Sequence, residues 1–171
     1  MTIKLGFLAS GGGTSIEALV ENISSGKLSG FEPRIALCNK PRGKAGIYER
    51  ADRLNLPIEH TRKSEKQLSI LKEYEVDLVL GLGYIKMVGD EILDYFGNRI
   101  WNIHPALLPK HGGKGMYGLA THESVLNSGD AETGATVHIM SPVYDDGKIL
   151  NQVKIPVFQG ETPESLQQRV L

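Results

Sequence analysis

Cysteine is almost absent from this sequence, because the 171 residues include only Cys38. A single cysteine excludes an intramolecular disulfide and any zinc site built mainly from thiolates. An excess of charge is also lacking, since 19 Lys and Arg residues stand against 20 Asp and Glu residues, for a net charge of −1. Without the basic field that dominates nucleic-acid affinity, we expect no polynucleotide partner.

Long apolar runs are missing as well. Nothing in the sequence requires a membrane span, and the first residues lack the charged, apolar and small-residue regions of a secretory leader. These absences predict a cytoplasmic protein with no membrane partner. The composition itself is ordinary for a globular protein, with 40% hydrophobic and 23% charged residues. Since the length suits one domain with a full core, we expect a single domain over residues 1–171.

Segments of strand length alternate with segments of helical periodicity through most of the chain. This alternation predicts right-handed crossovers and a doubly wound, Rossmann-like α/β sheet that is mostly parallel. Residues 133–140 and 149–157 instead predict two antiparallel strands, so that a C-terminal hairpin makes the sheet mixed. The other expected strands are 3–9, 33–38, 57–60, 77–82 and 99–104, and the expected helices are 16–23, 45–54, 67–74, 91–95, one from 122 and one from 162.

A glycine-rich sequence, Ser10-Gly-Gly-Gly-Thr-Ser15, follows the first expected strand. Glycine lets the backbone approach a ligand closely, and the free N–H groups at a helix start favour an anion. Thr14 or Ser15 is expected to cap that helix. The sequence is neither a Walker A loop nor a GxGxxG loop. It predicts a phosphate or another anion at Gly12, Gly13, Thr14 and Ser15, and the alternative is a turn with nothing bound at the helix start.

An amide and an imidazole lie two residues apart at the end of the expected strand 99–104. Asn102 and His104 have the same parity, so both side chains leave one face of the strand. Pro105 has no N–H and stops ladder pairing, which places His104 at the sheet edge where open α/β sheets bind ligands. The alternative is a hydrogen-bonded histidine beside a structural turn. The glycine-rich residues 110–118 predict a mobile loop over this site.

The acidic turn at residues 143–147 offers a partner for His104. A carboxylate there would hold the imidazole and raise its pKa. Asp145 and Asp146 are the candidates, although both can equally be solvated turn residues. Two further histidines favour structural interpretations, His60 as a surface or packing residue and His122 as part of an amphipathic helix. None of the histidine spacings indicates a metal site.

Three segments together resemble the folate-dependent formyltransferases. They are the loop 10–15, the sequence Asn102-Ile-His-Pro-Ala-Leu-Leu-Pro109, and Gly134-Ala-Thr-Val-His138 with Asp145-Asp-Gly147. The resemblance covers essentially the whole chain and is strongest to the members that formylate glycinamide ribonucleotide in de novo purine synthesis. It implies the formyltransferase fold, 10-formyltetrahydrofolate as co-substrate, small-molecule substrates only, and a monomer or a homodimer.

The resemblance also implies roles for individual residues. Asn102, His104 and Asp145 would be the catalytic trio, and the loop would hold the ribonucleotide phosphate. Formyl transfer to an amine passes through a tetrahedral oxyanion, to which an amide and a protonated imidazole can donate. A proton then moves from the amine to the departing folate nitrogen, a step that requires no metal. The residues expected around the folate are Lys86, Met87, Val88, Asn102, Met140, Ser141, Pro142, Val143 and Tyr144.

The sequence departs from the family's usual pattern at three places. Ser15 stands where the family usually has Asn, and Lys86 stands where Arg is common. The chain ends at Leu171 inside the last expected helix, before the acidic residue with which family members help to seat the amine, so a truncated end is expected. Two other functions stay open: a hydrolase of the same family that puts water in place of the amine, and a non-catalytic module that binds folate or nucleotide.

Overall fold

The computed structural model describes residues 2–171 and contains, within them, seven strands and six α-helices. The hydrogen-bonded order of the strands is β3-β2-β1-β4-β5-β6-β7. β1 pairs in parallel with β2 and β4, β2 pairs in parallel with β3, and β6 pairs antiparallel with β7. The prediction of a mixed α/β sheet with a C-terminal hairpin is confirmed. The strands are Ile3–Ala9 (β1), Phe31–Cys38 (β2), Ile58–His60 (β3), Leu78–Gly81 (β4), Ile100–His104 (β5), Glu132–Ile139 (β6) and Ile149–Pro156 (β7).

The contacts of the chain gather into two compact units. The N-terminal unit ends at Trp101, and the C-terminal unit runs from Asn102 to Leu171. The single domain expected from the chain length stays a prediction. Among residues 2–171, no helix combines the length and the apolar character needed to cross a membrane.

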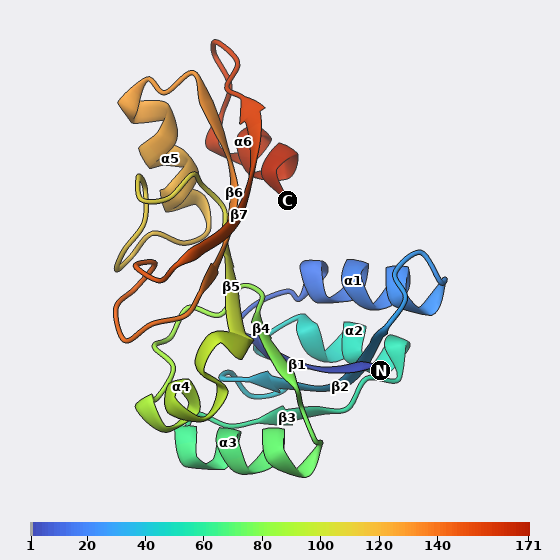
Figure 1. Cartoon of the computed structure of the whole chain (residues 1–171). Coiled ribbons are helices and arrows are strands. Elements are labelled where there is room, and N and C mark those ends of the chain that lie inside the picture. The colour runs from blue at the N-terminus through green and yellow to red at the C-terminus, as the bar shows by residue number, and fades with distance from the viewer. Residues whose placement is uncertain (1) are drawn as a thin grey trace. The chain divides into compact units, whose positions relative to one another are not determined.

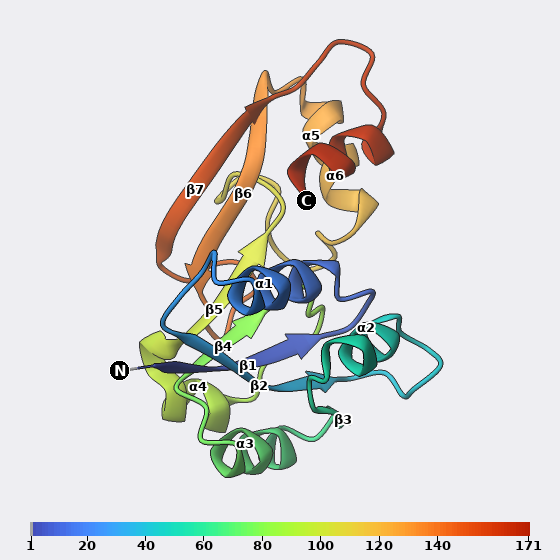
Figure 2. The same ribbon diagram turned by 90° about the vertical axis from the view of Figure 1, so that its right-hand side faces the viewer.

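In the N-terminal unit, helices cover both faces of the parallel strands. α1 and α2 pack together on one face, and α3 and α4 pack together on the other (Figures 1 and 2). β1 is therefore buried from Leu5 onwards, as its nearly uniform apolar sequence predicts. The helices of this unit are Thr14–Ser24 (α1), Ile47–Leu54 (α2), Ser64–Glu73 (α3) and Asp90–Phe96 (α4), with a 3₁₀ turn at Gly97–Arg99 (η1).

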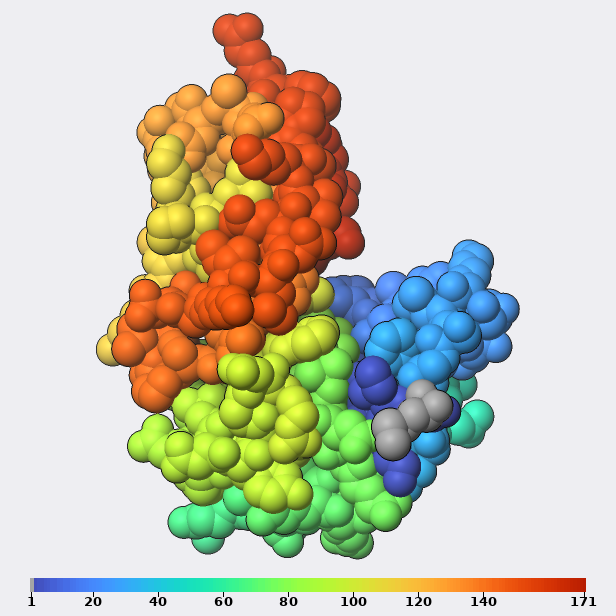
Figure 3. Space-filling view, in the orientation of Figure 1, coloured from blue at the N-terminus to red at the C-terminus, as the bar shows by residue number. Residues whose placement is uncertain are grey.

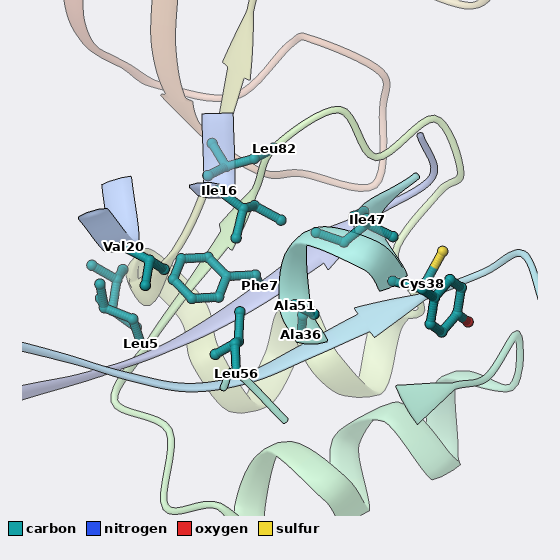
Figure 4. Packing of buried hydrophobic residues seen from close by; sticks show 13 residues of the cluster. Leu5, Phe7, Ile16, Val20, Ala36, Cys38, Ile47, Ala51, Leu56 and Leu82 are labelled. Atoms are coloured by element: carbon teal, nitrogen blue, oxygen red, sulfur yellow. The ribbon is translucent and has the colours of Figure 1, made fainter. Parts of the chain in front are cut away.

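Alternate residues of β1 serve the two helical layers. Phe7 is fully buried beside Val20 of α1 and belongs to the core cluster shown in Figure 4. Gly6 points to the other face, where a Cβ atom would lie 2.8 Å from the Leu71 side chain of α3. α3 can therefore approach the strand closely only because residue 6 has no side chain.

The C-terminal unit consists of the β6–β7 hairpin and two helices, α5 (Leu119–Ser128) and α6 (Pro163–Val170). The two helices pack against each other beside the hairpin (Figure 2). Val125 of α5 and Leu166 of α6 share a small core with Ala106. α6 starts as its sequence predicts, since the Thr162 hydroxyl accepts a hydrogen bond from the Ser165 N–H and proline occupies the first turn. β7 lies at the sheet edge, and its orange-red residues lie at the surface in Figure 3. The side chain of Val153 in this strand is 61% exposed.

The predicted helix starts differ from the structure by one to three residues. The largest differences are at α3, which begins at Ser64 and not at residue 67, and at α5, which begins at Leu119, three residues before His122. The first turn of a helix need not contribute apolar side chains to the core, so hydrophobic periodicity alone does not locate it.

Candidate active site

His104 ends β5 with its side chain buried. It is 3% exposed, whereas the preceding residue Ile103 is 42% exposed, so the predicted alternation along the strand is confirmed. The ring nitrogen Nε2 lies 2.8 Å from the backbone oxygen of His111. Nδ1 lies 3.4 Å from Oδ2 of Asp145. Each ring nitrogen of His104 thus faces an oxygen that can only accept a hydrogen bond.

Asp145 reaches His104 from the turn that joins β6 to β7. Its backbone has a φ of 56°, in the left-handed region. Oδ2 also accepts a hydrogen bond from the Gly113 N–H at 2.9 Å, and Oδ1 lies 3.5 Å from Nε2 of His138. The structure therefore brings together the imidazole and carboxylate that the sequence paired, while Asp146 is exposed.

Burial and charge act in opposite directions on this pair. Burial lowers the pKa of His104 below its ordinary value, and the Asp145 carboxylate and the His111 carbonyl only partly oppose it. Burial raises the pKa of Asp145, but the contact with His138, the hydrogen bond from the Gly113 N–H and the charge of His104 lower it overall. Asp145 therefore carries a negative charge at neutral pH, and His104 protonates less readily than an exposed histidine.

Asn102 contacts a histidine to which the sequence gave no role. Its Nδ2 lies 3.1 Å from Nε2 of His138, and Nδ1 of His138 lies 3.0 Å from the oxygen of Ile139. These contacts suit an imidazole that donates through Nδ1 and accepts the amide N–H at Nε2. The sequence could have indicated that His138 is buried, because Gly134, Thr136 and His138 are alternate residues of β6 and therefore lie on one face of the strand, which is the buried face.

His111 is the second histidine that the sequence did not single out. Its Nδ1 lies 2.8 Å from Oγ of Ser124, and its Nε2 lies 2.8 Å from Oδ2 of Asp130. Lys110 donates to the other oxygen of Asp130 at 2.8 Å. The hydrogen bonds from His111 and Lys110 lower the pKa of Asp130 to about 2. No short-range pattern marks these partners, which are 13 and 19 residues away along the chain.

The turn that follows His104 is held by polar side chains of the hairpin. The Thr136 hydroxyl donates to the Ala106 oxygen at 2.6 Å and accepts from the Leu108 N–H at 3.1 Å. The Gln152 amide donates to the Leu108 oxygen at 2.9 Å. The hairpin thereby fixes the backbone at the end of β5 and supplies Asp145 to the same place.

The glycine-rich loop lies in the N-terminal unit. α1 begins at Thr14 after Gly13, which has a φ of 78°, and no side chain caps the helix. The expectation that Thr14 or Ser15 caps α1 is wrong, because both residues lie inside its first turn. A Cβ atom at Gly13 would lie 2.2 Å from Cδ1 of Ile47, so this position requires glycine on two counts. The helix start offers backbone N–H groups to an anion, as the sequence predicts.

The two segments expected around the folate belong to different units. In the N-terminal unit, Lys86 and Met87 are exposed and Val88 is buried. In the C-terminal unit, Met140 is half-buried and Ser141 organises the turn, since its Oγ donates to the Val143 oxygen at 2.9 Å. Pro142 and Val143 are exposed and Tyr144 is half-buried. Met87 and Val143 each carry an exposed apolar side chain, and the role of these segments in binding folate stays a prediction.

The remaining histidines and the cavity add no reacting group to the trio. His60 is exposed, as predicted. His122 is fully buried, neither of its ring nitrogens has a hydrogen-bond partner among residues 2–171, and burial lowers its pKa. A cavity of about 270 Å³ is lined by residues that include His111 and Asp130 but none of the trio. Within residues 2–171, no group of three or more His, Cys, Asp or Glu side chains is placed to hold a metal ion.

Comparison with known proteins defines the class. The formyl transferase family model matches residues 3–171. The chain therefore belongs to the formyl transferase family, which confirms the resemblance carried by the three sequence segments.

Individual relatives narrow the comparison. The chain is 37% identical to a chloroplastic phosphoribosylglycinamide formyltransferase of Arabidopsis thaliana, with 98% of this chain and 60% of the relative covered. It is 31% identical to phosphoribosylglycinamide formyltransferase of Bacillus subtilis, with 98% of this chain and 86% of the relative covered. Glycinamide ribonucleotide transformylase 1 of Symbiobacterium toebii has a similar structure, with a TM-score of 0.89, 31% identity, and 99% and 80% covered. The chain spans 60% of the length of the relative from Arabidopsis thaliana and 56% of the length of a second chloroplastic relative, from Vigna unguiculata.

Proposed function

We propose that this chain transfers a formyl group from 10-formyltetrahydrofolate to the amine of glycinamide ribonucleotide, a step of de novo purine synthesis. The observation that carries the proposal is the contact of His104 with Asp145 at the end of β5, two residues after Asn102, in a member of the formyl transferase family. Relatives named phosphoribosylglycinamide formyltransferase support the choice of the amine substrate.

In the proposed mechanism, the trio stabilises the oxyanion while a proton moves between the two substrates. The amine attacks the formyl carbon, and the negative charge that develops on the formyl oxygen is stabilised by a hydrogen bond from the Asn102 amide and by the positive charge of the His104 imidazolium. Asp145 stabilises that imidazolium, because its carboxylate lies 3.4 Å from Nδ1. A proton passes from the attacking amine to the departing folate nitrogen, directly or through water, as the tetrahedral intermediate collapses.

Two further subsites complete the proposal. Gly12, Gly13, Thr14 and Ser15 hold the ribonucleotide phosphate, mainly through backbone N–H groups at the start of α1. Lys86, Met87 and Val88, with Asn102 and the residues from Met140 to Tyr144, surround the folate. Lys86 replaces the family's common Arg without loss if backbone atoms make the contact there.

One assay distinguishes the proposed transferase from its alternatives. The absorbance change of a 10-formylfolate analogue is followed with and without glycinamide ribonucleotide, and formate is measured in parallel. Turnover that requires the ribonucleotide, with no formate released, is the expected result. Formate released without the ribonucleotide would identify a hydrolase, and stoichiometric binding without turnover would identify a binding module.

Other properties expected from the sequence stay proposals. The partners are small molecules, with no nucleic acid and no membrane, and the protein is a monomer or a homodimer. The expected location is cytoplasmic, although two relatives are named as chloroplastic.

A further inference from the structure

We propose that His111 is a positioning residue for His104. Its imidazole, held between Ser124 and Asp130, fixes the turn whose carbonyl oxygen accepts the Nε2–H of His104. This inference rests on the proposed function for its kinetic consequence, but its geometry can be tested without any substrate.

The backbone of His111 has a conformation that is uncommon for a residue with a side chain. Its φ is 56°, in the left-handed region that only a few per cent of residues other than glycine adopt. Two side-chain contacts of 2.8 Å each hold the ring, one to Ser124 in α5 and one to Asp130 just after it. Because the ring bridges the loop after β5 to the end of α5, the surrounding structure supplies the free energy that the backbone conformation costs.

The held turn acts on both members of the His104–Asp145 pair. The His111 carbonyl accepts from His104, and two residues later the Gly113 N–H donates to Asp145. Gly112 between them packs closely, since a Cβ there would lie 2.5 Å from the Leu108 side chain and 3.1 Å from Cβ of Asp145. Residues 111–113 thus hold the imidazole and the carboxylate at the same time.

The contact with His111 decides which ring nitrogen of His104 carries the proton. Nε2 lies 2.8 Å from the His111 oxygen, whereas Nδ1 lies 3.4 Å from Oδ2 of Asp145, so the shorter contact keeps the hydrogen of the neutral ring on Nε2. Protonation at Nδ1 then gives an imidazolium with an acceptor at each nitrogen, and its positive charge stabilises the developing oxyanion. If the turn loosened, the other tautomer would compete and the imidazolium would lose one acceptor.

Four other titratable side chains surround the imidazole of His104. Asp145 approaches from the turn after β6, His138 from β6, His122 from α5, and His111 from the loop itself. The Asp145 carboxylate and the His111 carbonyl raise the pKa of His104, whereas burial and the nearby imidazoles of His138 and His111 lower it. Loosening the turn is therefore expected to lower the pKa of His104.

The test compares Ser124→Ala, Asp130→Ala and the double variant with the wild type in the full chain. Long-range ¹H–¹⁵N NMR of the imidazole nitrogens reports the tautomer and pKa of His104 without substrate. The double variant should lower that pKa by roughly half a unit or more and give Nδ1–H a visible population. In the transfer assay, kcat should fall about tenfold while KM changes less than about twofold.

Three controls separate position from charge and from damage to the fold. Ser124→Ala removes no charge, so a change in the pKa of His104 in this variant reports a change in the position of the turn at residues 111–113. Ser124→Thr keeps the hydroxyl and should restore the wild-type spectrum. Lys110→Met removes the other partner of Asp130 without touching His111 and should leave tautomer and kcat unchanged.

The outcomes are distinct. An unchanged tautomer and pKa of His104 in the folded double variant would overturn the positioning role, as would a Lys110→Met variant that behaves like the double variant. If the double variant does not fold, Ser124→Ala decides, since it lacks only one neutral hydrogen bond. A wild type without transfer activity would refute the proposed function, whereas the NMR arm would still decide the role of His111.

Discussion

At the scale of single residues, the trio predicts a sharp loss of rate. Changing His104 to Ala removes the positive charge that stabilises the oxyanion and should raise the barrier by ~3 kcal/mol or more. Asn102→Ala should have an effect of similar size. Steady-state kcat/KM measures both losses, and His60→Ala, an exposed histidine outside the trio, is the matched control. A folded His104→Ala or Asn102→Ala variant that kept wild-type turnover would show that the mechanism is wrong.

Replacing Asp145 with Asn should lower the pKa of His104, because the carboxylate raises that pKa against the effect of burial. The limb of the pH–rate profile that requires protonated His104 then moves to lower pH, and the rate at neutral pH falls. An NMR titration of His104 measures the shift directly. Asp146→Asn is the control, since this neighbouring side chain is exposed. A larger shift from Asp146→Asn would mean that the wrong carboxylate had been chosen.

The charged form of Asp130 should stabilise the folded protein, and this stabilisation should be lost in acid. The pKa of its carboxyl is lowered from 3.8 to about 2, so the folded state prefers the charged form. The resulting stabilisation is present above the unfolded pKa and is lost as pH falls toward the folded pKa. The urea midpoints of the wild type and Asp130→Asn should therefore differ at pH 5 and converge near pH 2. A difference that stayed constant over this range would contradict the assignment.

Sequence patterns pointed to the proposed trio but not to the residues that hold it in place. Asn102 and His104 followed from strand parity and from Pro105, which are local features. The family resemblance supplied Asp145, which lies 41 residues beyond His104 in number and was placed by no local rule. His111 and His138 were missed because their partners are set by how the loop, α5 and β6 fold together.

At the scale of elements, the start of α1 gives a prediction about backbone shape. Gly13→Ala should destabilise the protein by ~2 kcal/mol, because φ is 78° and the new Cβ would meet the fully buried Ile47. Urea denaturation measures the loss. Gly11→Ala is the matched control, since a Cβ there has no neighbour within 4 Å and its effect should stay within ~0.5 kcal/mol. Equal effects of the two variants would argue against the role of Gly13.

The order and type of the elements were predictable, whereas their first turns were not. Residues 3–9 were predicted as a strand and form β1 with those bounds. The predicted cap of α1 was wrong, because Gly13 ends the loop in a left-handed conformation and Thr14 and Ser15 therefore lie inside the helix. A cap depends on one backbone angle, and hydrophobic spacing carries no information about it.

At the scale of the whole molecule, the division into two units predicts where ligands act. Inorganic phosphate should shift the backbone amide signals of residues 11–15 and leave those of residues 111–113 unchanged, because the proposed phosphate subsite lies in the N-terminal unit. Amide NMR during a phosphate titration measures this. Equal shifts in both segments would contradict a separate phosphate subsite.

The burial of Cys38 has a practical consequence for any study of unfolding. The only thiol of the chain is fully buried in the core of the N-terminal unit, and the only tryptophan, Trp101, packs against the same cluster. Maleimide labelling and tryptophan emission therefore both report on the core of that unit. Residues 102–171, which carry His104, His111 and Asp145, contain neither a cysteine nor a tryptophan, so a label introduced there is needed to follow their unfolding directly.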